Sequence, residues 1–400
     1  YGFLQCAGRD LNPHALRHMA LNHACLPIPA PARLLDYYNW QRDSVKQIAV
    51  ILPNVEERTS MTIILDAMGS DDYPEPEILA AIELQKQGEN VLLVGNQEII
   101  KQHQKKLGLD NISLQIHDAP DIVEMTDKPV ESARKKPNNS MAVGLNLVKE
   151  GKAEAFVTAG NTGAAFFNAA AILKRLPGIS RPSLAAIIPV RNRKCVFMDT
   201  GANADCRPEF MLEFAVMGST YAGKLFNTSS PKVGLLANGE ESGKGNMLVK
   251  EAYPLLQKSG LNFYGNVEPK EVYAGQVDCV VTDGFSGNVF IKSSEAVAKL
   301  ILDMLKEGIS SRFLSKLGYL LAKPAFSSLK KMMDPSETGA ALLLGVNGLV
   351  FIGHGRSDAR ALISAVKLAR RTINSGLMES MRTEIENKLS STLSATEEKA

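Results

Sequence analysis

Four loops of this sequence combine glycine with asparagine and threonine or serine, residue types that bind anions without a metal. They span residues 159–163, 199–205, 238–246 and 282–288, and each follows a short apolar run. Glycine lets the backbone approach a ligand closely, N–H groups at a helix start favour anions, and Asn and Thr add neutral donors. We expect the four loops to converge on one edge of a sheet and to form an oxyanion or phosphate site there.

Familiar catalytic signatures are incomplete in these loops. Residues 239–245 resemble a P-loop but have one spacer too few, with Gly245 where Ser or Thr would hold magnesium. Residues 284–287 lack the spacing of a nucleophile elbow, no dinucleotide fingerprint follows the first apolar run, and no His or Cys cluster has zinc spacing. Loops of Gly, Asn and one lysine suit positioning and electrostatic stabilisation instead. The sequence therefore predicts a site without a metal or an organic cofactor.

Composition narrows the class of protein. With 45 basic and 43 acidic residues the formal charge is +2, which argues against nucleic acid as a main partner. Five scattered cysteines read as reduced thiols, so we expect a cytoplasmic location. The longest apolar run, residues 340–352, is interrupted by Asn347 and is shorter than the ~20 residues that span a bilayer. We expect a soluble protein, attached at most to a membrane surface.

Short apolar runs and amphipathic stretches alternate along most of the chain. The runs predict strands at residues 63–65, 91–94, 155–158, 185–190, 196–198, 233–236 and 279–281. The stretches between them predict helices at residues 77–87, 141–150, 209–223, 247–258 and 295–306. Continuous apolar strands suit a parallel sheet covered on both faces. The sequence therefore predicts an α/β fold, a three-layer αβα sandwich with a mostly parallel sheet.

The first sixty residues have a different composition from the rest. Residues 1–60 hold the one tryptophan, half of the histidines and several prolines, and no apolar period supplies a core face. The α/β pattern begins directly after Met61. Our hypothesis is that Met61 is the natural start and that residues 1–60 are translated upstream sequence; a genuine leader or disordered arm is the alternative. We expect one catalytic domain at residues 61–386 and a polar tail at 387–400.

Six motifs occur together and in order within that domain. They are Asp66-Ala67-Met68-Gly69, residues 158–164, residues 199–203, Lys244-Gly245-Asn246, Gly265-Asn266-Val267-Glu268 and residues 282–288. In these motifs the chain resembles the bacterial phosphate acyltransferase family (PlsX), from Met61 to about Glu386. The resemblance implies a fold similar to that of phosphotransacetylases and the isocitrate dehydrogenase class, and a homodimer. It also implies that acyl carrier protein thioester and inorganic phosphate become acyl phosphate and free carrier protein, for phospholipid synthesis.

The resemblance also implies which residues carry the reaction. Lys244 and Asn288 are the expected catalytic residues; we infer that Lys244 neutralises phosphate charge and that Asn288 donates to the thioester oxygen. The expected phosphate and substrate contacts are Asn161, Thr162, Gly163, Asn203, Gly245, Asn246, Thr282, Asp283 and Gly287. For Asn288 a helix cap is the structural alternative. The other functions that we consider are a phosphotransacetylase using a short acyl-coenzyme A and a non-catalytic acyl-carrier or membrane scaffold.

The chain departs from the family pattern at four places. Gly69-Ser70-Asp71-Asp72 replaces Gly-Gly-Asp-His, Arg207 replaces Lys, Met247 replaces Glu, and Glu337-Thr338-Gly339-Ala340 replaces Tyr-Gly-Gly-Ala. The central loops are intact, so these changes affect local contacts more than the reaction.

Residues 312–333 have an apolar stripe and a basic remainder. The stripe includes the expected membrane contacts Phe313, Leu314, Leu317 and Leu321. The charged residues of the segment are all basic, with no acidic residue in the part that the stripe occupies. Pro324 interrupts the pattern, so we predict a helical hairpin at about residues 308–333 that lies on an anionic membrane, the inner face of the plasma membrane. The resemblance adds a reason, because acyl phosphate would pass to a membrane-embedded glycerol-3-phosphate acyltransferase. A dimer interface is the alternative use of the same leucines.

Overall fold

The structure is a computed structural model that describes residues 61–311, 313–332 and 334–397. The hypotheses on residues 1–60, Arg312, Met333 and residues 398–400 lie outside the described residues. Within the described part, eleven strands form one sheet in the order β3-β2-β1-β4-β11-β10-β5-β6-β9-β7-β8. The strands are Ile63–Asp66 (β1), Val91–Gly95 (β2), Ile116–Asp118 (β3), Ala155–Thr158 (β4), Ser183–Val190 (β5), Arg193–Met198 (β6), Val233–Leu236 (β7), Phe263–Val267 (β8), Cys279–Val281 (β9), Ala341–Leu344 (β10) and Leu349–Ile352 (β11).

All seven predicted strands are present, and β3, β8, β10 and β11 were not predicted. The apolar run at residues 340–352 forms the antiparallel pair β10 and β11, joined by a turn around Asn347. β5 and β6 also pair antiparallel, because only Arg191 and Asn192 separate them and a two-residue loop makes a hairpin. Asn192, the second residue of this loop, has a positive φ of 63°.

These antiparallel pairs reverse the chain direction in the middle of the sheet. β3, β2, β1, β4 and β11 run parallel to one another, and so do β6, β9, β7 and β8. β10 lies antiparallel to both β11 and β5, and β6 lies antiparallel to β5. The two parallel groups therefore point in opposite directions. Their carboxyl ends lie at opposite edges of the sheet, named here the β4 edge and the β9 edge.

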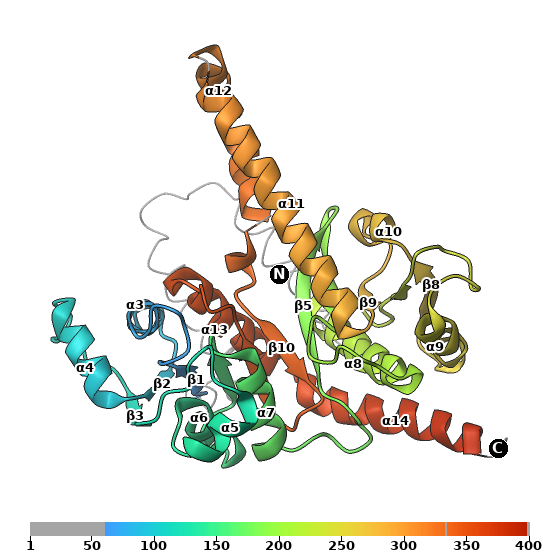
Figure 1. The fold of residues 1–400 in the computed structure, drawn as a ribbon, viewed down its shortest axis with the longest axis horizontal. Coiled ribbons are helices and arrows are strands. Elements are labelled where there is room, and N and C mark those ends of the chain that lie inside the picture. The colour runs from blue at the N-terminus through green and yellow to red at the C-terminus, as the bar shows by residue number, and fades with distance from the viewer. Residues whose placement is uncertain (1–60, 312, 333, 398–400) are drawn as a thin grey trace, which may run out of the picture. The chain divides into compact units, whose positions relative to one another are not determined.

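Helices cover both faces of the sheet (Figure 1). They are Glu75–Lys86 (α3), Gln97–Lys106 (α4), Pro129–Lys135 (α5), Ser140–Lys149 (α6), Thr162–Ile172 (α7), Pro208–Phe226 (α8), Met247–Lys258 (α9), Pro269–Ala274 (α10), Gly284–Ser310 (α11), Phe313–Met332 (α12), Ala359–Asn374 (α13) and Leu377–Glu397 (α14). Ile63 and Leu65 of β1 pack into one core cluster, whereas Ile64 packs into another on the opposite face. The three-layer αβα prediction is confirmed. Residues 387–397, expected in a polar tail, belong to α14.

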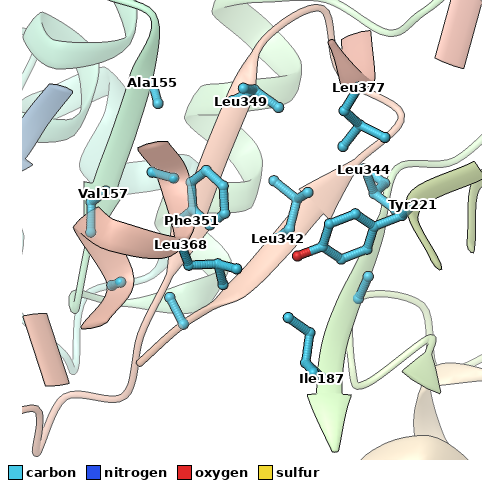
Figure 2. Packing of buried hydrophobic residues seen from close by; sticks show 14 of the residues in the cluster. Ala155, Val157, Ile187, Tyr221, Leu342, Leu344, Leu349, Phe351, Leu368 and Leu377 are labelled. Atoms are coloured by element: carbon cyan, nitrogen blue, oxygen red, sulfur yellow. The ribbon is translucent and has the colours of Figure 1, made fainter. Parts of the chain in front are cut away.

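The junction between the two parallel groups is filled by a continuous apolar core (Figure 2). Side chains from β4, β11, β10 and β5 meet side chains from α8, α13 and α14 there; those labelled include Val157, Phe351, Leu342, Ile187, Tyr221, Leu368 and Leu377. All of them belong to the largest buried cluster. Burying this apolar surface favours one fixed arrangement of the two groups, and therefore of the loops at their ends.

α11 and α12 form a helical hairpin that differs from the predicted one, because the segment predicted as a hairpin, about residues 308–333, supplies only the end of α11 and the single helix α12. α11 begins at Gly284 rather than near residue 295, and in Figure 1 it runs across the sheet and away from it, with α12 at its far end. α11 ends at Ser310, α12 begins at Phe313, and Pro324 lies inside α12. The prediction of a break at Pro324 is therefore wrong: proline removes one helical hydrogen bond, and the flanking turns keep the rest. None of the described helices is long and apolar enough to cross a bilayer.

Candidate active site

The sheet divides the four glycine-containing loops between its two edges. Residues 199–205, 237–246 and 282–288 follow β6, β7 and β9 and lie at the β9 edge. Residues 159–161 follow β4 and lie at the β4 edge, with the loops after β1 and β11. The expectation that all four loops converge on one edge is wrong, because the three successive antiparallel pairings from β11 through β10 and β5 to β6 reverse the strand direction. Lys244 and Asn288, the expected catalytic residues, follow neighbouring strands of the same edge.

The start of α11 packs directly on the loop after β6. Gly284 N donates to the Asn203 carbonyl at 2.7 Å. A Cβ atom added to Gly287 would lie 1.8 Å from the Asp199 carbonyl oxygen, so only glycine fits there. A Cβ atom on Gly201 would lie 3.4 Å from Asn288 Cγ. Asn288 is half-buried and lies against Gly201, at the point where the loops after β6 and β9 meet.

Asp199 organises the loop that carries Gly201. Its buried carboxylate accepts hydrogen bonds from the backbone N–H groups of Leu184, Gly201, Ala202 and Asn203 at 2.8–3.2 Å. Asn203 Nδ2 adds a fifth bond at 2.9 Å. Burial raises the pKa of Asp199, while these donors act in the opposite direction. A carboxylate with so many donors fixes the backbone around it, so Asp199 holds the loop in the form that Asn288 contacts.

Lys244 and Asn246 come from the loop between β7 and α9. Lys244 is exposed, and its side chain passes over Gly239, where an added Cβ atom would lie 2.8 Å from Lys244 Cγ. Within the described part of the chain Lys244 has no ion-pair partner, so its ammonium group is available to an anion. Asn246 caps α9 by accepting from Val249 N at 3.0 Å, which leaves its Nδ2 group without a hydrogen-bond partner among the described residues.

The structure separates asparagines with free donors from those whose donors are already used. Asn203 Nδ2 donates to Asp199 and to the Pro182 carbonyl at 2.8 Å, so this amide holds the loop rather than a ligand. Asn288 makes no hydrogen bond to the described residues through its side chain. It is not a helix cap, because Asp283 caps α11 by accepting from Ser286 N at 2.8 Å. The structure contradicts the cap alternative for Asn288.

The remaining predicted residues of the β9 edge shape the backbone. Thr282 is buried, and its N–H group donates to the Met198 carbonyl at 2.7 Å, which joins the ends of β9 and β6. Gly245 has a φ of 102°, and an added Cβ atom would lie 2.4 Å from Val249 Cγ1. Glycine is therefore required between Lys244 and the cap of α9.

At the β4 edge Asn161 is a structural residue. Its Oδ1 atom accepts from Ala164 N at 3.0 Å and caps α7. Its Nδ2 group donates to the carbonyls of Met125 and Asp127 at 2.9 and 3.1 Å. Thr162 and Gly163 follow it and are exposed. The α7 start therefore offers Thr162 and Gly163 to a ligand, while the amide of Asn161 is occupied.

Two buried carboxyl groups beneath the β4 edge were not singled out from the sequence. Asp66 accepts from Thr158 Oγ1 at 2.7 Å and from Met68 N at 3.0 Å. Glu77 accepts from Ser70 N at 3.1 Å, and burial raises its pKa to about 7. Asp66 does belong to the first recognised motif, but Glu77 gave no signal beyond its place in an amphipathic helix.

Thiol and metal chemistry have little support in the described residues. Cys195, Cys206 and Cys279 are free, and burial raises the pKa of Cys195 and of Cys206 to about 12, which keeps both thiols protonated. No group of three or more His, Cys, Asp or Glu residues that could hold a metal ion occurs in the described part of the chain.

The fold places the chain in a structural class. It is similar to a EutD phosphotransacetylase from Staphylococcus aureus, with a TM-score of 0.51 and 18% identity over 78% of this chain and 95% of that one. It is also similar to a phosphotransacetylase from Streptococcus pyogenes, with a TM-score of 0.51 and 21% identity over 82% and 94%. At these identities the likeness concerns the fold alone. The class is an α/β protein with the phosphotransacetylase fold.

Sequence relatives define the family more closely. The model of a family described as "Fatty acid synthesis protein" matches residues 61–380. A phosphate acyltransferase of Elusimicrobium minutum is 44% identical over 81% of this chain and 96% of its own length. A phosphate acyltransferase of Thermus thermophilus is 42% identical over 80% and 98%. The chain belongs to the phosphate acyltransferase family.

Proposed function

We propose that this enzyme transfers a long acyl group from acyl carrier protein to inorganic phosphate, and that the reaction occurs at the β9 edge. A phosphate oxygen attacks the thioester carbonyl carbon, forming the new C–O bond. The carbonyl oxygen becomes an oxyanion, and the C–S bond then breaks. The products are acyl phosphate and the carrier thiolate, which takes a proton from solvent.

The single observation that supports this location is the presence of unused donors on neighbouring strand ends. Lys244 and Asn288 keep their side-chain donors free, while Asn203 and Asp199 hold the surrounding backbone. We assign Lys244 to the charge of the phosphate and Asn288 to the developing oxyanion. Preorganised donors of this kind stabilise a transition state without covalent chemistry by the protein. Asn246, Gly245, Thr282, Asp283 and Gly287 complete the proposed cradle.

Thr162 and Gly163 belong to a different part of the proposed site. They lie at the β4 edge, and α11 joins the two edges: Glu295 Oε1 of α11 is 3.9 Å from His354 Nε2 in the loop after β11. Glu295 follows Asn288 by seven residues, about 10 Å along a helix. We propose that Thr162 and Gly163 contact the longer acyl-carrier substrate, and that Asn161 has a structural role, capping α7 and donating to the carbonyls of Met125 and Asp127.

The experiment that tests this function is a direct assay. Protein, long-chain acyl carrier protein thioester and phosphate are incubated, and acyl phosphate is trapped with hydroxylamine while free carrier thiol is measured. We expect both products only when phosphate is present. Faster turnover of a short acyl-coenzyme A would favour a phosphotransacetylase, and the absence of phosphate-dependent thioester cleavage would favour a non-catalytic scaffold.

We also propose that α12 lies on an anionic membrane surface. Leu314, Leu320 and Leu321 are 78, 70 and 84% exposed, and Lys316 and Lys323 beside them are exposed too. Apolar side chains with basic neighbours suit the interface of an anionic bilayer. Phe313 and Leu317 belong to the same proposed contact, although their side chains lie outside the described ones.

α11 offers a second exposed apolar surface, for which we propose a homodimer. Val297, Leu300, Ile301 and Met304 are 45–62% exposed and recur at helical spacing. A dimer through α11 leaves α12 free for the membrane, so the two proposals are compatible. The proposed location is therefore cytoplasmic, peripheral to the inner face of the plasma membrane. There a membrane-embedded glycerol-3-phosphate acyltransferase would use the acyl phosphate.

A further inference from the structure

Asn266 is a buried polar residue that the proposed chemistry does not use. It lies in β8 and is 2% exposed. Its Nδ2 group donates to the carbonyl of Glu241 at 2.8 Å and reaches the carbonyl of Lys244 at 3.5 Å. Both acceptors belong to the loop between β7 and α9. Asn266 therefore contacts both ends of the four-residue turn that presents Lys244.

The turn has few other buried contacts. Lys244 N donates to the Glu241 carbonyl at 2.9 Å, which closes the turn itself. Residues 240–244 are exposed, and no atom lies within 4 Å of the position where a Cβ on Gly243 would be. Glu240 pairs with Lys270, but both side chains are more than half exposed, so this ion pair holds the loop weakly. Asn266 is the buried anchor of the turn.

Asn266 is unfavourable for stability at this buried position, which indicates that its amide has a functional role. Its Oδ1 atom is buried and has no hydrogen-bond partner among the described residues. The reverse orientation of the amide would direct Oδ1 at the Glu241 carbonyl, so two acceptors would face each other. The next residue of β8, Val267, is fully buried and apolar. A buried strand position that keeps an unpaired acceptor is unfavourable for stability, and such positions are retained where function needs them.

We propose that Asn266 is a positioning residue that fixes the Lys244 ammonium group toward the phosphate. The inference rests on the proposed function. Asn266 acts through the backbone of the turn and does not itself contact the phosphate. Without its amide the turn moves, and the ammonium of Lys244 spends less time at the phosphate position.

A double-mutant cycle tests this role. Asn266→Ala should lower kcat/KM for phosphate about 10–100-fold, because displacing a charged group by about 1 Å has effects of that size. In a Lys244→Ala background the same change should cost less than about 3-fold, because the group that it positions is absent. Phosphate Kd values from isothermal titration give the same cycle without turnover.

Matched variants separate positioning from general damage. Asn262 Nδ2 donates to the Ser230 carbonyl at 3.0 Å at the opposite end of β8, so Asn262→Ala should leave kcat/KM unchanged in both backgrounds. The isosteric Asn266→Asp keeps the side-chain volume but lacks the amide donor, so it should reproduce the activity loss if Asn266→Ala does not fold. Equal losses from the Asn266 change in both backgrounds, or a fully active Asn266 variant, would overturn the proposal. An inactive wild-type enzyme would instead contradict the proposed function.

Discussion

Gly287 is the position where the packing of the candidate site can be tested most directly. In Gly287→Ala the new methyl group would lie 1.8 Å from the Asp199 carbonyl oxygen. That distance is about 1.5 Å less than the roughly 3.3 Å at which carbon and carbonyl oxygen normally meet. The start of α11 must therefore separate from the loop after β6, and Asn288 moves with it. Overpacking of this kind costs about 1–3 kcal/mol of stability.

The effect on activity should exceed the effect on folding. A displacement of about 1 Å at a catalytic group can reduce the rate about 10²-fold, so we expect a loss in kcat/KM of at least that size. The assay is phosphate-dependent release of carrier thiol, with thermal denaturation measured on the same samples. The control is Gly308→Ala in the same helix, where nothing lies within 4 Å of the new methyl group. It should remain active and gain about 0.5–1 kcal/mol, since alanine is the better helix former. Near-normal activity of Gly287→Ala would refute the packing argument.

Four other changes have definite expected outcomes. Lys244→Ala should lower kcat/KM about 10²–10³-fold with an unchanged melting temperature, because an exposed electrostatic donor is lost; a well-folded, active variant would contradict this role. Asn288→Ala should reduce kcat more than it raises KM for phosphate, and a fall in stability that matches the loss of activity would indicate a structural residue instead. Burial raises the pKa of Glu77 from its usual value of 4.5 to about 7, so between these two pH values the folded protein keeps a proton that the unfolded protein has lost. The free energy of unfolding should therefore fall by about 3 kcal/mol as pH rises from 4.5 to 7. Glu77→Gln should reduce this pH dependence in denaturation curves measured across that range. Changing Leu317 and Leu321 to Glu should release the protein from anionic vesicles while a dimer remains in size-exclusion chromatography; continued vesicle binding would exclude the membrane contact.

Local sequence was sufficient for much of the fold and for locating the loops that carry the candidate site. Seven strands were predictable because short runs of β-branched residues bounded by glycine or asparagine are typical of buried strands. They are β1, β2, β4, β5, β6, β7 and β9. Helix α9 was predicted with its observed bounds, Met247–Lys258. The glycines around Lys244 and before Asn288 indicated close backbone packing, and the six ordered motifs indicated the family. Each strand, helix and motif is encoded in one short stretch of consecutive residues, although the six motifs together extend from Asp66 to Asn288.

Only the tertiary structure decided where the loops lie and which donors remain free. β10 and β11 come from residues 341–352 and pair with β5 and β4, strands far from them along the chain. Together with the β5–β6 pair, their antiparallel pairings reverse the strand direction between the two parallel groups. Asn161, Asn203 and Asn288 cannot be distinguished by their sequence context, since all three follow a strand in a loop containing glycine. Their amides differ because the Nδ2 group of Asn161 donates to the Asp127 carbonyl and that of Asn203 to the Pro182 carbonyl, whereas the Asn288 amide, beside Gly201, makes no hydrogen bond to the described residues. These acceptors are 34 and 21 residues away along the chain, and a hydrogen bond between distant residues exists only once the fold has brought them together.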